Sequence, residues 1–170
     1  MSELRIAGVV GESITDGPGF RFTVFTQGCP HHCEGCHNPQ THDFNGGEVV
    51  DTDTLWDRIS DDIMLSGVTF SGGEPFEQAT SLLPLARKIK DAGLELAAYS
   101  GYTFEELMQA GGDKLELLRL CDVLVDGRFV LSQRSLMLRF RGSRNQRLID
   151  VPKSLASGVA TEIHDGRWQD

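Results

Sequence analysis

The order of secondary-structure signals in this 170-residue chain predicts an α/β fold built on parallel strands. Short β-favouring runs such as "RFTVFTQ" alternate with segments whose apolar residues recur at helical spacing. Glycine-containing loops follow most of these runs directly. Strands that alternate with helices pair in parallel through right-handed crossovers. A complete eight-stranded barrel needs about 250 residues. We therefore expect one domain, residues 1–170, that forms a partial barrel open along one side.

Two elements are predicted before residue 65. A strand over residues 21–27 leads directly into a loop that contains three cysteines. A helix over residues 53–64 follows, and Asp51 or Thr52 is expected to cap it. Its buried face is predicted from apolar residues four positions apart, which are Leu55, Ile59 and Ile63. The first ten residues leave open whether a further strand precedes these elements.

The remaining elements follow the same alternation. The strand "GVTF" ends in the loop "SGGEP", and the next helix ends near Gly93 and tolerates Pro84 only near its first turn. The apolar face of that helix consists of Leu82, Leu85, Ala86 and Ile89. After the strand "LELAAYS", Thr103 and Glu106 have the spacing of a capping box for a short helix. A helix over residues 114–120 and strands at "CDVLVDG" and "QRLIDV" complete the pattern, and the tail beyond Pro152 has no strong signal.

Composition and charge exclude several classes of function. The formal net charge of −9 and the pI of about 5.0 argue against nucleic acid as the main partner, since phosphate binding needs a basic surface. No apolar run is long enough to cross a membrane, and no secretory signal is visible, so a cytoplasmic location is expected. The charge is uneven, however, because residues 128–147 contain six arginines and no Asp or Glu.

Four short motifs each follow a predicted strand: the three-cysteine loop, "SGGEP", "SGY" and "DGRF". The carboxyl ends of parallel strands meet at one edge, where α/β folds place their chemistry, so we expect these motifs on one rim. Gly72 and Gly73 would let the backbone approach a ligand closely. Asp126 and Arg128 are candidates either for ligand contact or for an internal ion pair.

The three-cysteine loop carries the strongest chemical signal. Cys29, Cys33 and Cys36 lie within eight residues of one another, whereas Cys121 stands alone. A disulfide framework would distribute cysteines in pairs along the chain, so this clustering indicates metal or redox chemistry. Cys121 is predicted to be a small buried apolar residue.

Two kinds of metal site fit three clustered thiols. A structural zinc site would need a fourth ligand from a nearby histidine: His31, His32, His37 or His42. Zinc ligands usually come as two separated pairs, however, and here there is one compact triplet. An iron–sulfur cluster of four irons normally takes four cysteines. With three, one iron keeps an exchangeable position, and this spacing favours that interpretation.

The spacing C-x₃-C-x₂-C is similar to the signature of the radical SAM superfamily. The resemblance implies that Cys29, Cys33 and Cys36 hold a [4Fe–4S] cluster whose fourth iron binds S-adenosylmethionine. One electron would then cleave this cosubstrate into methionine and a 5′-deoxyadenosyl radical. "TFSGGEP" resembles the GGE motif of the same superfamily, which implies that Glu74 faces the ammonium group of the methionine moiety.

One position departs from the superfamily pattern. An aromatic residue often precedes the third cysteine, and this chain has Gly35 there, directly before Cys36. Stacking on adenine would then fall to His37 or to backbone contacts. The other histidines of the loop are expected to face solvent.

Longer motifs resemble the activating proteins of anaerobic (class III) ribonucleotide reductases over residues 11–151. They are "DGPGFRFTVFTQGCPHHCEGCHNPQTHDF", "SGGEP", "YSGYTFEEL", "VLVDGRF" and "RGSRNQRLIDV". The resemblance implies a protein substrate, the anaerobic ribonucleoside-triphosphate reductase, on which the radical would remove a hydrogen from a glycine Cα. It also implies an electron donor such as flavodoxin. No nucleic-acid or membrane partner is expected, from the acidic net charge and the lack of a long apolar run.

Three alternatives stay open at this point. The chain could activate another glycyl radical enzyme such as pyruvate formate-lyase, act on a small molecule as another radical SAM enzyme, or be a zinc-binding interaction module. The arginine-rich segment, residues 128–147, is either partner surface or locally ion-paired.

Overall fold

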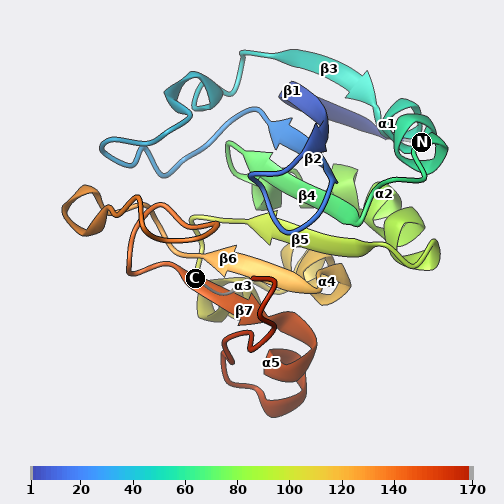
Figure 1. Cartoon of the computed structure of the whole chain (residues 1–170). Coiled ribbons are helices and arrows are strands. Elements are labelled where there is room, and N and C mark those ends of the chain that lie inside the picture. The colour runs from blue at the N-terminus through green and yellow to red at the C-terminus, as the bar shows by residue number, and fades with distance from the viewer. Residues whose placement is uncertain (1, 169–170) are drawn as a thin grey trace.

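The computed structural model describes residues 2–168, which form a mixed α/β structure around a seven-stranded open sheet (Figure 1). The strands are β1 (Glu3–Ser13), β2 (Arg21–Thr26), β3 (Glu48–Asp51), β4 (Gly67–Gly72), β5 (Glu95–Tyr99), β6 (Val123–Asp126) and β7 (Arg147–Asp150). Their order in the sheet is β3-β1-β2-β4-β5-β6-β7. The four central strands, from β2 to β6 in this order, are parallel, as predicted.

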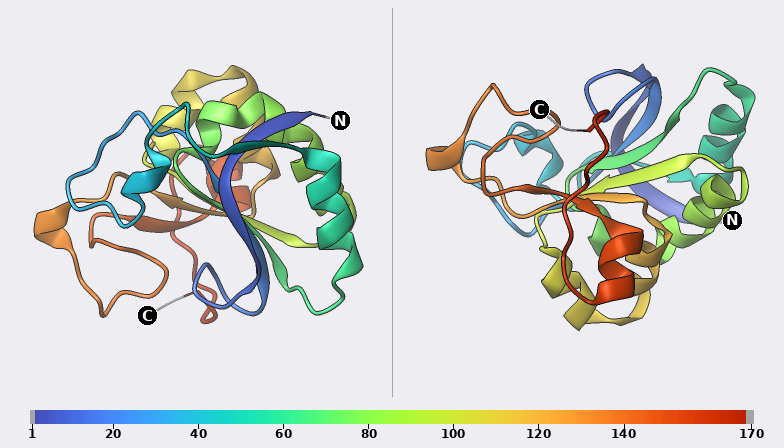
Figure 2. Two further views of the ribbon diagram at one scale, coloured as in Figure 1. Left: turned by 90° about the horizontal axis from the view of Figure 1, so that it is seen from above. Right: turned by 60° about the horizontal axis from the view of Figure 1, so that its bottom comes forward.

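The α-helices lie on one face of this sheet (Figure 2). They are α1 (Thr52–Asp61), α2 (Ala79–Asp91), α3 (Phe104–Ala110), α4 (Gly112–Leu120) and α5 (Val151–Ser157). Short 3-10 helices occur at η1 (Pro39–Thr41), η2 (Pro75–Gln78) and η3 (Leu131–Gln133). In residues 2–168 no helix combines the length and apolar character needed to cross a membrane.

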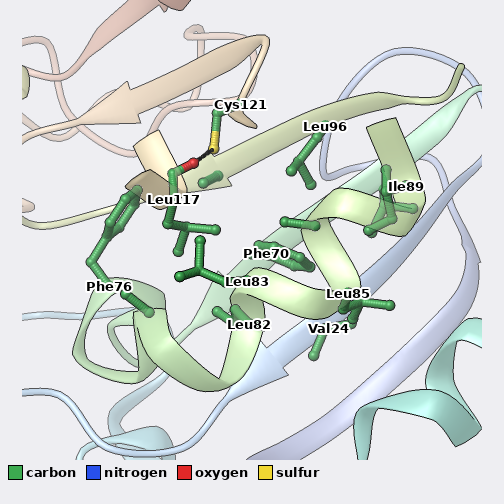
Figure 3. Packing of buried hydrophobic residues seen from close by; sticks show 14 of the residues in the cluster. Val24, Phe70, Phe76, Leu82, Leu83, Leu85, Ile89, Leu96, Leu117 and Cys121 are labelled. Atoms are coloured by element: carbon green, nitrogen blue, oxygen red, sulfur yellow. Dashed lines mark hydrogen bonds between the residues drawn. The ribbon is translucent and has the colours of Figure 1, made fainter. Parts of the chain in front are cut away.

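The main core lies between the sheet and the helices. Val24, Phe70 and Leu96 come from three neighbouring strands and point toward α2 (Figure 3). The predicted apolar face of α2 meets them there, because all its members are buried: Leu82, Leu85, Ala86 and Ile89. Each large apolar side chain buried in this way contributes about 1.5–3 kcal/mol. The alternation of β-strand residues thus fixes which face receives the helices.

The opposite face of the sheet is closed near the amino ends of the central strands. Arg21 is fully buried there, where its Nε donates to Thr69 Oγ1 at 2.8 Å and its Nη1 to Glu95 Oε1 at 2.8 Å. The buried ring of Trp168 lies over the Arg21 guanidinium and meets Phe140 edge-on. This packing fills one end of the inner face and leaves the carboxyl ends of the strands for a cavity.

Several local predictions are confirmed. Asp51 caps α1 by accepting from Asp53 N at 2.9 Å, and Thr103 and Glu106 form the capping box of α3. Gly93 follows α2 with φ of +79°, a backbone conformation that suits glycine at a helix end. Cys121 is buried in the core, where its Sγ donates to Leu117 O at 3.4 Å (Figure 3).

Two helix predictions are wrong in detail. The first helix ends at Asp61 instead of residue 64, and Ile63 is 93% exposed. The Asp62 side chain accepts from Met64 N at 2.9 Å, and such an Asx turn competes with helical hydrogen bonding. Pro84 lies in the second turn of α2, beyond the expected first turn. The burial of that helix's apolar face outweighs the one backbone hydrogen bond that proline removes.

The expectation of parallel strands holds only for the centre of the sheet. β1 and β3 pair antiparallel to their neighbours, and so does β7, which follows β6 without a helical crossover. Neither β3 nor α5 was predicted. In α5, Asp150 caps by accepting from Lys153 N, and Pro152 lies in the first turn, so the tail does carry a helix-start signal. Of the predicted domain range, residue 1 and residues 169–170 lie outside the described residues.

Replacing Glu95 by Ala tests the buried polar network. Glu95→Ala leaves the fully buried Arg21 without its carboxylate, and we expect the free energy of unfolding in urea to fall by about 3 kcal/mol. The control is Glu116→Ala, whose pair with Arg119 is half-exposed and should contribute less than about 0.5 kcal/mol. Equal losses in the two variants would contradict this interpretation of the inner face.

Candidate functional site

A cavity of about 550 Å³ opens at the carboxyl ends of the parallel strands. All four predicted motifs contribute to its lining, so the expectation of one rim is confirmed. The lining includes Cys29, Cys33, Cys36, His37, Gly72, Gly73, Ser100, Gly101, Gly127 and Phe129. The volume falls in the range of about 300–1,000 Å³ that is usual for small-molecule and cofactor sites.

The cysteine loop leaves β2 and is fixed at its base by backbone hydrogen bonds. Gly28 N donates to Thr41 O at 2.7 Å, and Cys29 N donates to His42 O at 3.2 Å. Within the loop, Cys36 N donates to Cys33 O at 3.2 Å. All three thiols are free; Cys29 is buried, and Cys33 and Cys36 are half-buried. The loop therefore presents three sulfur donors to one cavity.

Burial changes the acidity of two of these thiols. It raises the pKa of Cys29 to about 11, with a smaller contribution from the negative charge of Glu74. Burial also raises the pKa of Cys33. A metal group must therefore displace a proton from each of these thiols when it binds, because the thiolate is the ligand.

The thiols are not prearranged around a common point. Within residues 2–168, no three Cys, His, Asp or Glu side chains are close enough to one another to hold a metal ion. The assignment of these three cysteines as ligands thus rests on the chemistry of their thiols and on the cavity that they share.

Gly72 and Gly73 pack the loop after β4 against the cysteine loop. Gly72 has φ of +91°, and a Cβ there would lie 2.5 Å from Thr26 N. A Cβ on Gly73 would lie 2.5 Å from Gly28 O. Gly73 N and Glu74 N each donate 2.8 Å hydrogen bonds to this neighbouring backbone, at Thr26 O and Gly28 O. Both glycines line the cavity, but their closest contacts are to the backbone beside the cysteine loop.

Glu74 is fully buried behind the cavity wall. Its Oε1 accepts from Gly101 N at 2.8 Å and lies 2.6 Å from His31 Nε2. Its Oε2 accepts from Ser100 Oγ at 2.8 Å and from Phe76 N at 3.2 Å. This carboxylate joins the cysteine loop, its own loop and the "SGY" loop.

His31 is not a solvent-facing residue, which corrects the prediction. Its side chain is only 4% exposed, because it turns inward to Glu74 and meets the Tyr102 ring edge-on. His32 is exposed, as predicted, and His42 contributes to the cavity lining.

Asp126 and Arg128 do not belong to the cavity lining, and both form ion pairs. The buried Asp126 accepts from Phe104 N at 2.8 Å and pairs with Arg147 Nη2 at 2.5 Å. Arg128 is exposed and pairs with Glu106 at 3.3 Å. Both residues thus form the internal ion pairs that the sequence left open, and their contact with a ligand stays a prediction.

The aromatic side chains near Gly35 come from other positions. A Cβ on Gly35 would lie 2.8 Å from Leu131 Cδ1 and 3.4 Å from Phe129 Cε1. The His37 ring faces Phe129 with the ring centroids 5.2 Å apart. Gly35 itself is exposed and outside the cavity lining. The motif "DGRF" predicts the loop that carries Phe129, but nothing in the motif indicates that the Phe129 ring meets His37.

The motif "RGSRNQR" connects the segment before β7 to the end of β6. Asn145 Nδ2 donates to Arg128 O at 2.8 Å, and Gln146 Nε2 donates to Gly127 O at 3.0 Å. Gln146 Oε1 accepts from Gly142 N at 2.8 Å. The motif therefore shapes one wall of the cavity. The sequence alone does not predict this structural role for the motif.

A match to a known protein family indicates the class of protein to which this site belongs. Residues 15–149 match the family described as a 4Fe-4S single cluster domain. The match includes all three loop cysteines and most of the cavity lining. The family match thus assigns this chain to the class of proteins with a 4Fe–4S single cluster domain.

Curated relatives narrow the class further. The chain is 35% identical over 142 residues to the anaerobic ribonucleoside-triphosphate reductase-activating protein of Escherichia coli (strain K12), covering 78% of this chain and 90% of that protein. The protein of the same name from Enterobacteria phage T4 is 32% identical over 140 residues, covering 78% and 85%. The chain belongs to the family of anaerobic ribonucleoside-triphosphate reductase-activating proteins.

Among solved structures, QueE from Escherichia coli aligns with a TM-score of 0.47 at 19% identity, over 59% of this chain and 53% of that chain. A likeness at this level is too weak to assign a fold.

The raised pKa of Cys29 predicts how the cluster-free protein reacts with iodoacetamide. Only the thiolate reacts, so with a pKa of about 11 the alkylation rate should rise about tenfold per pH unit between about pH 8 and 10. Peptide mapping by mass spectrometry measures the rate at Cys29 separately from the other cysteines. A rate that levels off near pH 9 would show an ordinary thiol and contradict the burial effect.

Proposed function

We propose that this chain is a radical SAM activase that generates a glycyl radical on anaerobic ribonucleoside-triphosphate reductase. The observation that supports it best is that the three cysteines and the GGE loop line one cavity in a chain that spans 90% of a reductase-activating relative at 35% identity. These relatives favour reductase activation over the activation of pyruvate formate-lyase, small-molecule chemistry or a zinc-binding module.

Cys29, Cys33 and Cys36 are the proposed ligands of a [4Fe–4S] cluster. The donor set fits, because thiolates suit iron–sulfur clusters and these three free thiols share one cavity. Three ligands for four irons leave one iron open for S-adenosyl-L-methionine. When bound, the cluster and this cosubstrate supply a 5′-deoxyadenosyl radical.

The chain's own residues would bind and orient the cosubstrate. Gly72 and Gly73 give a wall without side chains, which lets the ligand approach the backbone. His37 and Phe129 offer aromatic faces beside the third cysteine. Glu74 remains our candidate for the ammonium group. His31 now lies against its Oε1, so this imidazole would have to turn away for a direct contact.

The open sheet suits a protein substrate. We propose that it is the partial barrel of the radical SAM type, in one domain over residues 1–170, and that its open side admits the glycine-bearing loop of the reductase. In this proposal the chain is an oxidoreductase of the cytoplasm that receives its electron from a donor such as flavodoxin.

Anaerobic reconstitution tests the whole proposal. The protein is loaded with iron and sulfide and mixed with S-adenosylmethionine, dithionite and the reductase. We expect 5′-deoxyadenosine and a glycyl-type EPR doublet on the reductase. A chain that takes up one tetrahedral zinc ion and no iron would overturn the proposal.

Single cysteine variants test the ligand set. Cys29→Ser, Cys33→Ser and Cys36→Ser should each lose most of the about four irons per chain expected after reconstitution. Cys121→Ala is the matched control and should keep them, because Cys121 lies in the core between sheet and helices. Iron analysis and the visible absorption of the cluster provide the measurement. Retention of a full cluster by any loop variant would remove that cysteine from the set.

A further inference from the structure

We propose that the arginine segment, residues 128–147, is a docking surface for an acidic segment of the protein substrate that flanks the reacting glycine. This inference rests on the proposed function, and it adds the place and chemistry of the contact. Three observations support it: position, exposed apolar side chains and unpaired positive charge.

The arginine segment lies at the mouth of the cavity. It connects β6 to β7 and projects beyond the sheet near the cysteine loop (Figures 1 and 2). Phe129, Phe140 and Arg141 from this segment line the cavity, and Leu131 packs close to Gly35 of the cysteine loop. A chain bound along the outer surface of the segment would therefore lie beside the cavity entrance.

The segment exposes several large apolar side chains. Leu136 is 86% exposed and Met137 is 88% exposed, and Leu131 is also exposed. Adjacent large apolar side chains in water often mark an interaction surface. Methionine adapts its shape to a partner more readily than branched residues do.

Two of the six arginines keep their charge available. Arg128 pairs with Glu106, and Arg147 pairs with Asp126, so local carboxylates neutralise these two charges. Arg134 and Arg144 are exposed, and neither makes an ion pair with any residue in the range 2–168. The backbone holds these two arginines near each other, because Arg144 N donates to Gln133 O at 3.0 Å and Arg134 bridges to Ser143.

The charge distribution favours an acidic protein over an anionic membrane. The chain carries a net −9, whereas the arginine segment contains six arginines and no acidic residue. An anionic bilayer presents a wide negative surface, which the rest of this molecule would repel. A single acidic chain segment can meet the arginine segment alone, within the screening distance of about 8–10 Å.

The test compares two double charge reversals in the full, cluster-loaded chain. Arg134→Glu/Arg144→Glu should weaken binding to the anaerobic reductase about tenfold or more, and the wild-type affinity should fall with salt. The matched control is Arg87→Glu/Arg119→Glu, which changes the net charge equally on helices α2 and α4, on the other face of the sheet. It should bind within about twofold of wild type.

Further measurements separate this inference from the proposed function. Formation of 5′-deoxyadenosine with dithionite and no reductase should be the same in all variants, which shows that cluster and cosubstrate sites are intact. A third variant, Leu136→Ser/Met137→Ser, should also bind the reductase more weakly without losing the cluster.

Each remaining outcome refutes the docking surface, and one of them also refutes the proposed function. If the wild type binds the reductase and Arg134→Glu/Arg144→Glu binds equally well, the docking surface is refuted and the proposed function stands. If the wild type forms a cluster and 5′-deoxyadenosine but neither binds the reductase nor gives a glycyl radical, both fail. Cosedimentation of the wild type with phosphatidylcholine–phosphatidylglycerol vesicles, lost in Arg134→Glu/Arg144→Glu, would assign the segment to membranes and overturn the inference.

Discussion

The loop after β4 and the cysteine loop are joined backbone to backbone, and the cavity depends on this junction. Gly73 N and Glu74 N donate to Thr26 O and Gly28 O, and this close approach leaves no space for a side chain on Gly72 or Gly73. The buried Glu74 carboxylate then ties His31 and the "SGY" loop to the same point. Because three loops share one buried anion, a change in any of them alters the wall that faces the three sulfur atoms.

Much of the fold could be predicted because local signals and burial agree. Alternating apolar residues in the central strands, the face of α2 and the capping box at Thr103 all point to the structure observed. The site was predictable in composition, since the cysteines and glycines follow strands whose carboxyl ends must meet. In these places each local preference supports the same global arrangement.

The parts that could not be predicted depend on contacts between distant residues. Nothing near His31 in the sequence indicates that it pairs with Glu74, and nothing near Asp126 indicates its pair with Arg147. Short edge strands such as β3 have weak patterns because the sheet, not their own sequence, holds them in place. Ile63 matched a helical period, yet an Asx turn at Asp62 ended the helix before it.

The contacts of Trp168 link the packing of the inner face to the order in which the chain is synthesised. Its ring contacts Arg21, near the beginning of the chain, and Phe140, in the segment before β7. The ribosome makes residue 168 after every other part of the sheet, so a growing chain must keep the inner end of its sheet unfinished until translation has passed that position. Final closure of the inner face therefore follows the synthesis of all seven strands of the sheet.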